Sequence, residues 1–515
     1  MSTHLDTYKK WQPFLLGLSA AIGLIAGMNM RQIQKPLVET NSYPLNATDR
    51  IQKFADVLGY IQSKYIDSID LDESTDLALD AWLSTLDPYS DYIPSSEINA
   101  FANRMNGTAQ DFGLDLIISD TTVYIQHVRE VSEAFKVGME SGDQIKRING
   151  MSVHPDMYAL DSLIETIFES NQDTVEFEWY SRKQARNHIS KIALSTFKDE
   201  AVTLSFSPEA GIVYLKIKIL NKESYREFMN VLETYVSDKN CKRLIIDLRG
   251  NAGGMVHEAA YILNQLIPEK DVLLFKTKGS KTTEKEFKST GKPFFRLDKI
   301  IVLVDAETAS AAELIAASLQ DLDRAIAIGQ NTYGKGTVLE QYSLPDGSAI
   351  RFAVSRFITN SGRCIQKPYD NANGYIFLSN PEDSSKAIYY SVKKRKLVSN
   401  QGVVPDIEIP DSNPALDSSN HSLSVQIVAE HILELKKLVT KNKESIENNK
   451  PLDLILKNGF LKAQANYPGI KWNESQLIQT CHAILQLWIY GEQAYQQQLL
   501  KTDPVFLKAI SEIKN

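Results

Sequence analysis

Three short apolar runs, each followed by a helical pattern, constrain the fold of this chain more than any other feature. They cover residues 212–217, 244–246 and 300–304, within a segment of about 203–410 where strand and helix patterns alternate. Strands of a parallel sheet read as continuous apolar runs, because helices bury both faces of the sheet. The alternation therefore predicts an α/β layer with parallel strands.

The regions on either side of this layer have a different pattern. Residues 49–105 carry apolar side chains at three- and four-residue steps, which predicts helices interrupted by a turn at 87–90. Short strands follow from about residue 107, and one of them ends at the Asn-Gly turn of residues 149–150. From about residue 421 the pattern predicts amphipathic helices. The 515 residues are enough for three or four domains.

The N-terminus carries a strongly apolar stretch. Residues 11–30 contain no charged side chain, and about 20 helical residues span a hydrocarbon core. Lys9 and Lys10 precede the stretch, which favours export of the remainder. We expect a cytoplasmic tail at 1–10, a transmembrane anchor at 11–30 in a bacterial-type inner membrane, a linker at 31–48 and a periplasmic remainder. A cleaved signal peptide, which leaves a periplasmic protein, and a buried core helix are the alternatives, although no clear cleavage site is present.

Composition excludes several classes of protein. The net charge is −8 and no basic stripe offsets it, which argues against nucleic acid as a partner. The three cysteines are scattered, so disulfides do not organise the fold. No histidine motif or carboxylate cluster has metal-ligand spacing, and we expect neither a metal nor a cofactor.

One serine and one lysine stand in unusual small-residue contexts. Ser310 lies in TASAAE directly after the third apolar run, and Lys335 lies in TYGKGT, 25 positions later. A serine hydroxyl becomes a good nucleophile when a nearby base takes its proton, and a desolvated lysine is such a base. The two side chains can meet only through the fold. The alternatives are a helix N-cap for Ser310 and a solvated loop lysine for Lys335.

Two neighbouring segments add to this pattern. The N–H of Ala311, at the start of the expected helix, is a candidate oxyanion donor, and the glycine-rich turn DLRGNAGG at 247–254 is a candidate source of a second. A plain strand–helix turn is the alternative for that segment. A phosphate-binding loop is excluded, because Lys335 precedes a glycine and a strand instead of Ser or Thr and a helix.

Together these segments resemble the carboxy-terminal processing peptidases, also called tail-specific proteases. The resemblance runs in order through 87–92 (DPYSDY), 113–194, 247–254, 310–313 (SAAE), 334–336 (GKG), 345–348 (PDGS) and 402–406 (GVVPD). It implies an α/β protease core with a crotonase- or Clp-protease-like layered sheet and helices. The implied domains are a helical N-terminal region at 49–106, an inserted PDZ domain at 107–198, the catalytic core at 199–412 and a helical C-terminal extension at 413–515.

The resemblance also implies a function. Family members are serine endopeptidases that use a Ser–Lys dyad, which makes Ser310 the nucleophile and Lys335 the general base. The oxyanion hole would consist of the Ala311 N–H with that of Gly253 or Gly254. The PDZ domain would hold the terminal carboxylate of a substrate tail with the backbone of Gly113, Leu114, Asp115 and Leu116. The implied partners are protein or peptide substrates with exposed C-termini, and homo-oligomerisation is left open.

One position departs from the family pattern. The family commonly has a glutamine four residues after the lysine, where this chain has Leu339. Gln341 faces the same side of a regular strand as Leu339, so it is a better substitute than Glu340. A bare dyad is the alternative, because desolvation alone lowers a lysine pKa. Because of this departure a second function remains as an alternative: a catalytically silent adaptor that binds C-terminal tails.

Overall fold

The computed structural model describes residues 46–119, 122–153, 174–370, 376–377, 388–410, 418–442, 446, 449–466 and 473–515. The chain divides into two units, Met1–Ala78 and Leu79–Asn515. The predicted tail at 1–10, the anchor or signal at 11–30 and nearly all of the linker at 31–48 lie outside the described residues. Within the described ranges, no helix combines the length and hydropathy that a membrane span requires.

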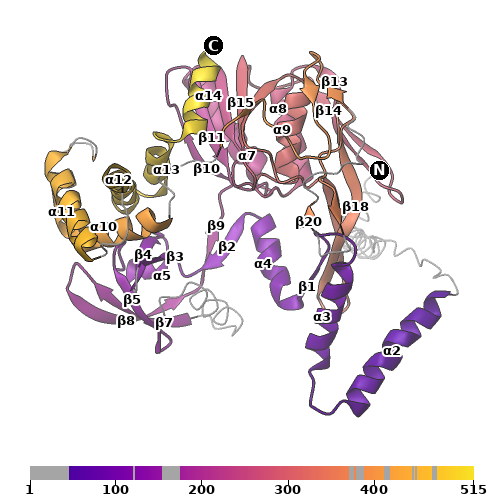
Figure 1. Cartoon of the computed structure of the whole chain (residues 1–515), viewed down its shortest axis with the longest axis horizontal. Coiled ribbons are helices and arrows are strands. Elements are labelled where there is room, and N and C mark those ends of the chain that lie inside the picture. Colours follow the sequence, from indigo (N-terminus) through magenta and orange to yellow (C-terminus); the bar gives the residue numbers. More distant parts are fainter. Residues whose placement is uncertain are drawn as a thin grey trace, which may run out of the picture. The chain divides into compact units, whose positions relative to one another are not determined.

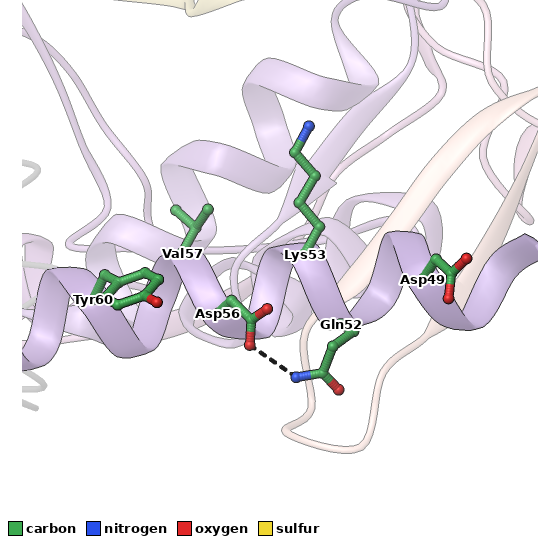
Figure 2. Close-up of a pocket in the computed structure, with 6 residues that line it drawn as sticks. All are labelled: Asp49, Gln52, Lys53, Asp56, Val57 and Tyr60. Carbon is green, nitrogen blue, oxygen red and sulfur yellow. Dashed lines mark hydrogen bonds between the residues drawn. The ribbon is translucent and has the colours of Figure 1, made fainter.

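The first unit contains α2 (Asn46–Lys64) and the start of α3 (Leu71–Leu83). Helices are therefore present where the sequence predicts them. Figure 2 shows a shallow pocket on α2, in which Gln52 Nε2 donates a 2.9 Å hydrogen bond to Asp56 Oδ1. The pocket is lined by Asp49, Gln52, Lys53, Asp56, Val57 and Tyr60. It lies on the surface of one helix and includes neither Ser310 nor Lys335.

A six-stranded sheet forms the centre of the second unit. Its order is β10 (Val202–Phe206), β11 (Ile212–Ile217), β12 (Arg243–Asp247), β15 (Lys299–Val304), β16 (Ala325–Gly329) and β23 (Ile407–Glu408). From β11 to β23 neighbouring strands are parallel, and only β10 is antiparallel to its neighbour. Helices α7 (Ser224–Leu232), α8 (Val256–Leu266) and α9 (Ala311–Asp321) alternate with the strands along the chain. This confirms the predicted parallel α/β layer.

The apolar runs arise because both faces of this sheet are buried. In β15, Ile300 and Val302 belong to the hydrophobic core on the side of α7, α8 and α9. Ile301 and Leu303 belong to a second core, which the C-terminal helix α14 (Pro504–Lys514) covers. Figure 1 shows α14 beside β11 and β15, on the side away from α8 and α9. Burying one such side chain is worth about 1.5–3 kcal/mol.

A second, antiparallel sheet packs on the other side of α8 and α9. It runs β1 (Asp91–Ile93), β18 (Ala349–Thr359), β13 (Lys270–Lys278) and β14 (Lys285–Thr290), and β17 (Thr337–Ser343) also pairs with β18. Every residue of α9 is buried between the two sheets. The strand predicted after Lys335 is confirmed as β17. The expectation of helix throughout 49–105 is wrong at β1, because that segment completes a ladder with the distant β18.

The described residues between 114 and 193 form a further antiparallel sheet with its own core. Its order is β3 (Leu114–Ser119), β4 (Thr122–Val128), β5 (Gln144–Ile148), β7 (Thr174–Ser181) and β8 (Arg186–Ala193), with β6 (Met151–Ser152) on β5 and the short helix α5 (Glu133–Lys136) after β4. Before and after this sheet, β2 (Thr108–Asp111) pairs with β9 (Ser195–Lys198), so the chain returns close to where it entered. Strand β3 lies at the edge of the sheet.

The predicted C-terminal helices are also present. Helices α10 (Ser418–Asn442), α11 (Lys450–Asn466), α12 (Glu474–Tyr490) and α13 (Glu492–Leu500) precede α14. Helices α10 and α12 pack against β3 and β4, as Figure 1 shows. The remaining elements are α4 (Ser95–Met105), a π-helix (Glu233–Asp238), β19 (Tyr369–Asp370), β20 (Ile376–Phe377), β21 (Tyr389–Tyr390) and β22 (Lys396–Leu397).

Candidate active site

Three loops follow the carboxyl ends of three adjacent strands of the central sheet. Residues 248–255 follow β12, residues 305–310 follow β15 and residues 330–336 follow β16. The carboxyl ends of parallel strands lie at one edge of a sheet, which is where α/β proteins bind their ligands. The fold therefore brings the glycine-rich turn, the loop of Ser310 and the loop of Lys335 to the same edge.

Ser310 ends a tight turn at the start of α9. Its φ of 54° and ψ of −120° are rare for a residue with a side chain. Such a conformation persists only when its surroundings hold it. Here the Ala309 N–H donates to the Asn251 carbonyl at 2.9 Å. A Cβ atom on Gly253 would lie 2.9 Å from Ser310 Cβ, so only glycine fits against the serine.

Two backbone N–H groups near Ser310 have no protein acceptor among the described residues, those of Ala311 and Gly254. The Gly253 N–H, in contrast, donates to Asn251 Oδ1 at 2.8 Å. Gly254 has a φ of 138°, and a Cβ there would lie 2.1 Å from the Leu220 carbonyl oxygen. Of the two glycines considered from the sequence, Gly254 is thus the one whose N–H is available to a ligand.

Asn251 holds the glycine-rich turn in place and was not singled out from the sequence. Its side chain is fully buried, and Nδ2 donates to the Ile217 carbonyl at 2.9 Å while Oδ1 accepts from Gly253. The only sequence signal is an asparagine within a glycine-rich turn, a position where its side chain commonly bonds nearby backbone.

Arg249, which precedes the same turn, joins it to the C-terminal helix. Its guanidinium binds Asp247 at 2.7 Å and Asp503 at 2.6 Å, and the Tyr214 hydroxyl donates to Asp247 at 2.7 Å. Asp503 is the N-cap residue of α14 and accepts from two backbone N–H groups of that helix. All these carboxylates are buried, so the network is shielded from solvent.

We expect Asp503→Ala to lower the free energy of unfolding by about 3 kcal/mol, because it removes a helix cap and leaves the half-buried Arg249 with one carboxylate. Urea denaturation of the full chain measures this change. The control is Lys508→Ala on the exposed side of the same helix, where an i,i+4 pair with Glu512 is lost and stability should not change. Equal stability of the Asp503 variant and the parent would contradict the role of the network.

Lys335 lies in an enclosed position beside an aromatic ring. Its Nζ is 4.9 Å from the centroid of the Tyr89 ring. Burial lowers the pKa of Lys335, and the Arg351 guanidinium lowers it further. The carboxylates of Asp91, Asp87 and Glu313 act in the opposite direction without reversing the shift. The amine is thus easier to deprotonate than that of an exposed lysine.

Glu313 joins the serine and lysine loops. It is the last residue of the SAAE motif, and the sequence alone assigns it no role. Its carboxylate is fully buried and accepts four hydrogen bonds. Oε2 accepts from the N–H groups of Ser310 and Lys335, each at 2.8 Å. Oε1 accepts from the Gly334 N–H at 2.8 Å and from Thr332 Oγ1 at 2.5 Å. Burial raises the pKa of Glu313, and the four donors oppose that shift.

The side chains of the two predicted catalytic residues are not hydrogen-bonded to each other in the described structure. Among the described residues, no hydrogen bond joins Ser310 Oγ to Lys335 Nζ, although Glu313 binds both backbones. Catalytic hydrogen bonds are often long or absent without substrate, so this geometry leaves the pair as a candidate. An acidic residue three positions after an N-cap serine matches a capping box, so the sequence signals the contact of Glu313 with Ser310. It gives no signal for the contact of Glu313 with Lys335.

The structure does not bring Gln341 to the lysine. Gln341 is exposed on β17 opposite Arg351, and in the described part of the chain neither it nor Glu340 bonds to Lys335. The ladder shifts register between Val338 and Leu339, so β17 is not a regular strand at this point. The role of Gln341 stays a prediction.

Two side chains that sequence reasoning missed do reach the lysine loop. Gln366 Oε1 accepts from the Gly336 N–H at 2.8 Å. Lys367 Nζ donates to the Thr332 carbonyl at 2.7 Å, and burial lowers the pKa of Lys367 as well. A second, half-buried lysine that the sequence did not distinguish therefore contacts this loop.

The four residues predicted to bind a substrate tail lie where edge strand β3 begins. Gly113 has a φ of 74°, and a Cβ there would lie 2.2 Å from Ser132 Cβ. Its N–H donates to Asp111 Oδ1 at 2.5 Å. Leu114 and Leu116 pack against the core of their own sheet, and Asp115 lies 3.5 Å from Arg129. Within the described ranges, no group of His, Cys, Asp and Glu side chains has the arrangement of a metal site.

The part of the chain that forms this site also matches a known protein family. Residues 211–370 match the model of peptidase family S41, and they contain the serine, the lysine and the glycine-rich turn. Over this segment the chain is similar to peptidase family S41, and over a longer part of its length it is similar to carboxy-terminal processing proteases.

The particular relatives are bacterial processing proteases. The carboxy-terminal processing protease CtpA of Bacillus subtilis is 28% identical over 315 residues, which cover 60% of this chain and 65% of CtpA, just under two thirds. CtpB of the same organism is 25% identical over 362 residues, 68% of this chain and 73% of CtpB. A solved photosystem II D1 C-terminal processing protease aligns with a TM-score of 0.38 at 20% identity, over 69% of this chain and 86% of that one.

Proposed function

We propose that this chain is a serine endopeptidase that cleaves proteins from their C-terminal tails, with Ser310 as nucleophile and Lys335 as general base. The observation that carries the proposal is the Glu313 carboxylate, which binds the backbone N–H groups of both residues. A buried lysine with a lowered pKa and two available N–H groups beside the serine add the remaining parts of an acyl-transfer site.

The proposed reaction uses these groups in order. Rotation of the Lys335 side chain brings its neutral amine to Ser310 Oγ and takes the proton as the oxygen attacks the substrate carbonyl. The oxyanion that forms accepts hydrogen bonds from the N–H groups of Ala311 and Gly254. The lysine ammonium then donates its proton to the leaving amine, and an acyl-enzyme remains. Water, deprotonated by the same amine, releases the second product and restores the serine hydroxyl.

We further propose that residues 107–198 are a PDZ domain that captures substrate tails. Within the described part of the chain no strand pairs with the outer side of edge strand β3, where an extended peptide could add. Gly113 begins that strand in a conformation that favours glycine. Because the Gly113 N–H is already bonded to Asp111, the N–H groups that follow it are the better candidates for the terminal carboxylate.

The other domain bounds, the localisation and the oligomeric state are also proposals, and they rest on the sequence patterns and the family resemblance. Residues 199–412 would be the catalytic core, and 49–106 and 413–515 the helical regions on either side. We keep the proposal of an exported peptidase, tethered to a bacterial-type inner membrane by residues 11–30 or released into the periplasm after cleavage. Homo-oligomerisation is an open proposal.

Active-site labelling tests the proposed function. We expect a fluorophosphonate probe to label the full chain and to fail with Ser310→Ala. The parent should cleave a peptide that ends in a free carboxylate faster than the same peptide with an amidated C-terminus. A parent protein that binds such tails but neither labels nor cleaves would instead support the silent adaptor.

The role of Gln341 has its own test. We expect Gln341→Ala to keep kcat/KM for a tail peptide within about twofold of the parent, because the side chain is exposed and has no hydrogen bond to Lys335 in the described chain. The matched variant is Gln366→Ala, which removes the hydrogen bond to the Gly336 N–H and should lower kcat about 10-fold. The reverse order of effects would restore Gln341 to the site.

A further inference from the structure

The segment 87–92, which the resemblance includes but to which the proposed reaction assigns no role, forms a rigid turn beside Lys335. Asp87 Oδ1 accepts from the N–H groups of Tyr89 and Ser90, each at 2.9 Å, and Asp87 Oδ2 accepts from Ser90 Oγ at 2.7 Å. This is the side-chain-to-backbone bonding by which aspartate fixes a turn. The strand that follows, β1, pairs with β18. These hydrogen bonds hold Tyr89 beside Lys335.

The Tyr89 ring is itself fixed from several sides. It is buried, and its hydroxyl accepts from Gln366 Nε2 at 3.1 Å, while the same glutamine binds the Gly336 N–H. The rings of Tyr333 and Tyr369 each lie 6.4 Å from it. Burial raises the pKa of Tyr89, so its hydroxyl stays protonated and does not compete as a base. What Tyr89 offers Lys335 is the face of an aromatic ring.

An aromatic face distinguishes the two protonation states of a lysine. It attracts an ammonium within about 6 Å of its centroid through the ring quadrupole, and it has no such attraction for a neutral amine. Lys335 Nζ, at 4.9 Å, is within that distance. The base in a Ser–Lys dyad acts only as the neutral amine.

We infer that Tyr89 is a positioning residue for the general base: its ring receives the ammonium of Lys335 and holds it away from Ser310 until the proton is lost. The inference rests on the proposed function, since it takes Lys335 as the base. Loss of the proton removes the attraction to the ring and leaves the amine able to rotate toward the serine hydroxyl.

Other charged groups face Lys335 and must stay constant in a test. They are Arg351 on β18, Asp91 on β1, Asp87 in the turn and Glu313 on α9. Arg351 and Asp91 form an ion pair with each other. A change confined to the electron density of the Tyr89 ring leaves all four groups in place, so a shift in the titration of Lys335 then reports the ring alone.

The experiment replaces Tyr89 by phenylalanine and then by phenylalanines with one, two and three ring fluorines. Fluorine withdraws electron density from the ring face with little change of shape, so the series keeps the fold. In a Ser310→Ala background, 13C NMR of lysine Cε, assigned by Lys335→Arg, gives the pKa of Lys335. In proteins that retain Ser310, the acidic limb of kcat/KM against pH gives the same value through catalysis.

We expect the pKa of Lys335 to fall stepwise with fluorination, by about half a unit to one unit over the series, with Tyr89→Leu as the end point. The acidic limb of the rate profile should move by the same amount. An NMR pKa that is constant across the series would overturn the inference, and so would a rate profile that moves while the NMR pKa does not. An NMR pKa that moves in a protein that never cleaves a tail would uphold the lysine–ring contact and overturn the proposed function alone.

Discussion

We expect Lys335→Ala to cleave a tail peptide with a kcat/KM about 10³-fold below that of the parent protein. General-base catalysis contributes about 10²–10⁴-fold, and a serine hydroxyl without a base is a weak nucleophile. Burial lowers the pKa of Lys335, so the rate of the parent should rise with pH through a value below that of an ordinary lysine. Steady-state kinetics from neutral to alkaline pH measures both effects.

Two controls make this result specific. Lys367→Ala removes the half-buried lysine whose Nζ donates to the Thr332 carbonyl of the loop, and should keep kcat within about 10-fold. The double variant Ser310→Ala with Lys335→Ala should be no slower than either single variant, because residues that act as a unit are not additive. If Lys367→Ala loses the larger share of activity, the assignment of Lys335 as the base is wrong.

The second large effect is expected at Glu313. We expect Glu313→Gln to lower kcat at least about 10²-fold and the free energy of unfolding by roughly 3 kcal/mol. Each carboxylate oxygen accepts two hydrogen bonds, one pair from Ser310 and Lys335 and the other from Thr332 and Gly334. If the new NH₂ faces Ser310 and Lys335, it meets two N–H donors. If it faces Gly334 and Thr332, it meets the Gly334 N–H and a hydroxyl that must reverse its own bond.

The control for Glu313→Gln is Glu307→Gln in the same loop before α9. Glu307 is exposed, so this isosteric change should affect neither kcat nor stability. Kinetics and urea denaturation of the two variants compare the same chemical substitution at a buried and an exposed position. A Glu313→Gln protein with the activity of the parent would show that the carboxylate does not hold the two loops in register.

Local patterns in the sequence were sufficient for much of the fold. The apolar runs predicted β11, β12 and β15, because a strand buried on both faces leaves a continuous apolar signal. Because each apolar run ends where its strand ends, the runs also located the glycine-rich turn at 247–254 and the turn that contains Ser310. The contexts of Ser310 and Lys335 marked both residues, although neither context shows that the two loops meet.

The features that the sequence did not predict share one physical cause. Strand β1 lies in a segment whose composition suggested helix, yet its ladder partner β18 begins at Ala349, far along the chain. Gln366 meets Tyr89 across a similar separation. Asp503 reaches Arg249 from the last helix. Tertiary pairing of this kind overrides local propensity and leaves no periodic trace in either segment.

What the sequence determined by itself was much of the local structure, since the spacing of apolar residues, the glycines of the turns and the helix-start signal at Ser310 depend only on near neighbours. The tertiary structure alone decided which polar groups meet. Glu313 receives donors from two loops, Arg249 receives a carboxylate from the C-terminal helix, and Lys335 lies over Tyr89. Buried polar groups must find partners wherever the folded chain supplies them, and those partners are set by the packing of the whole fold.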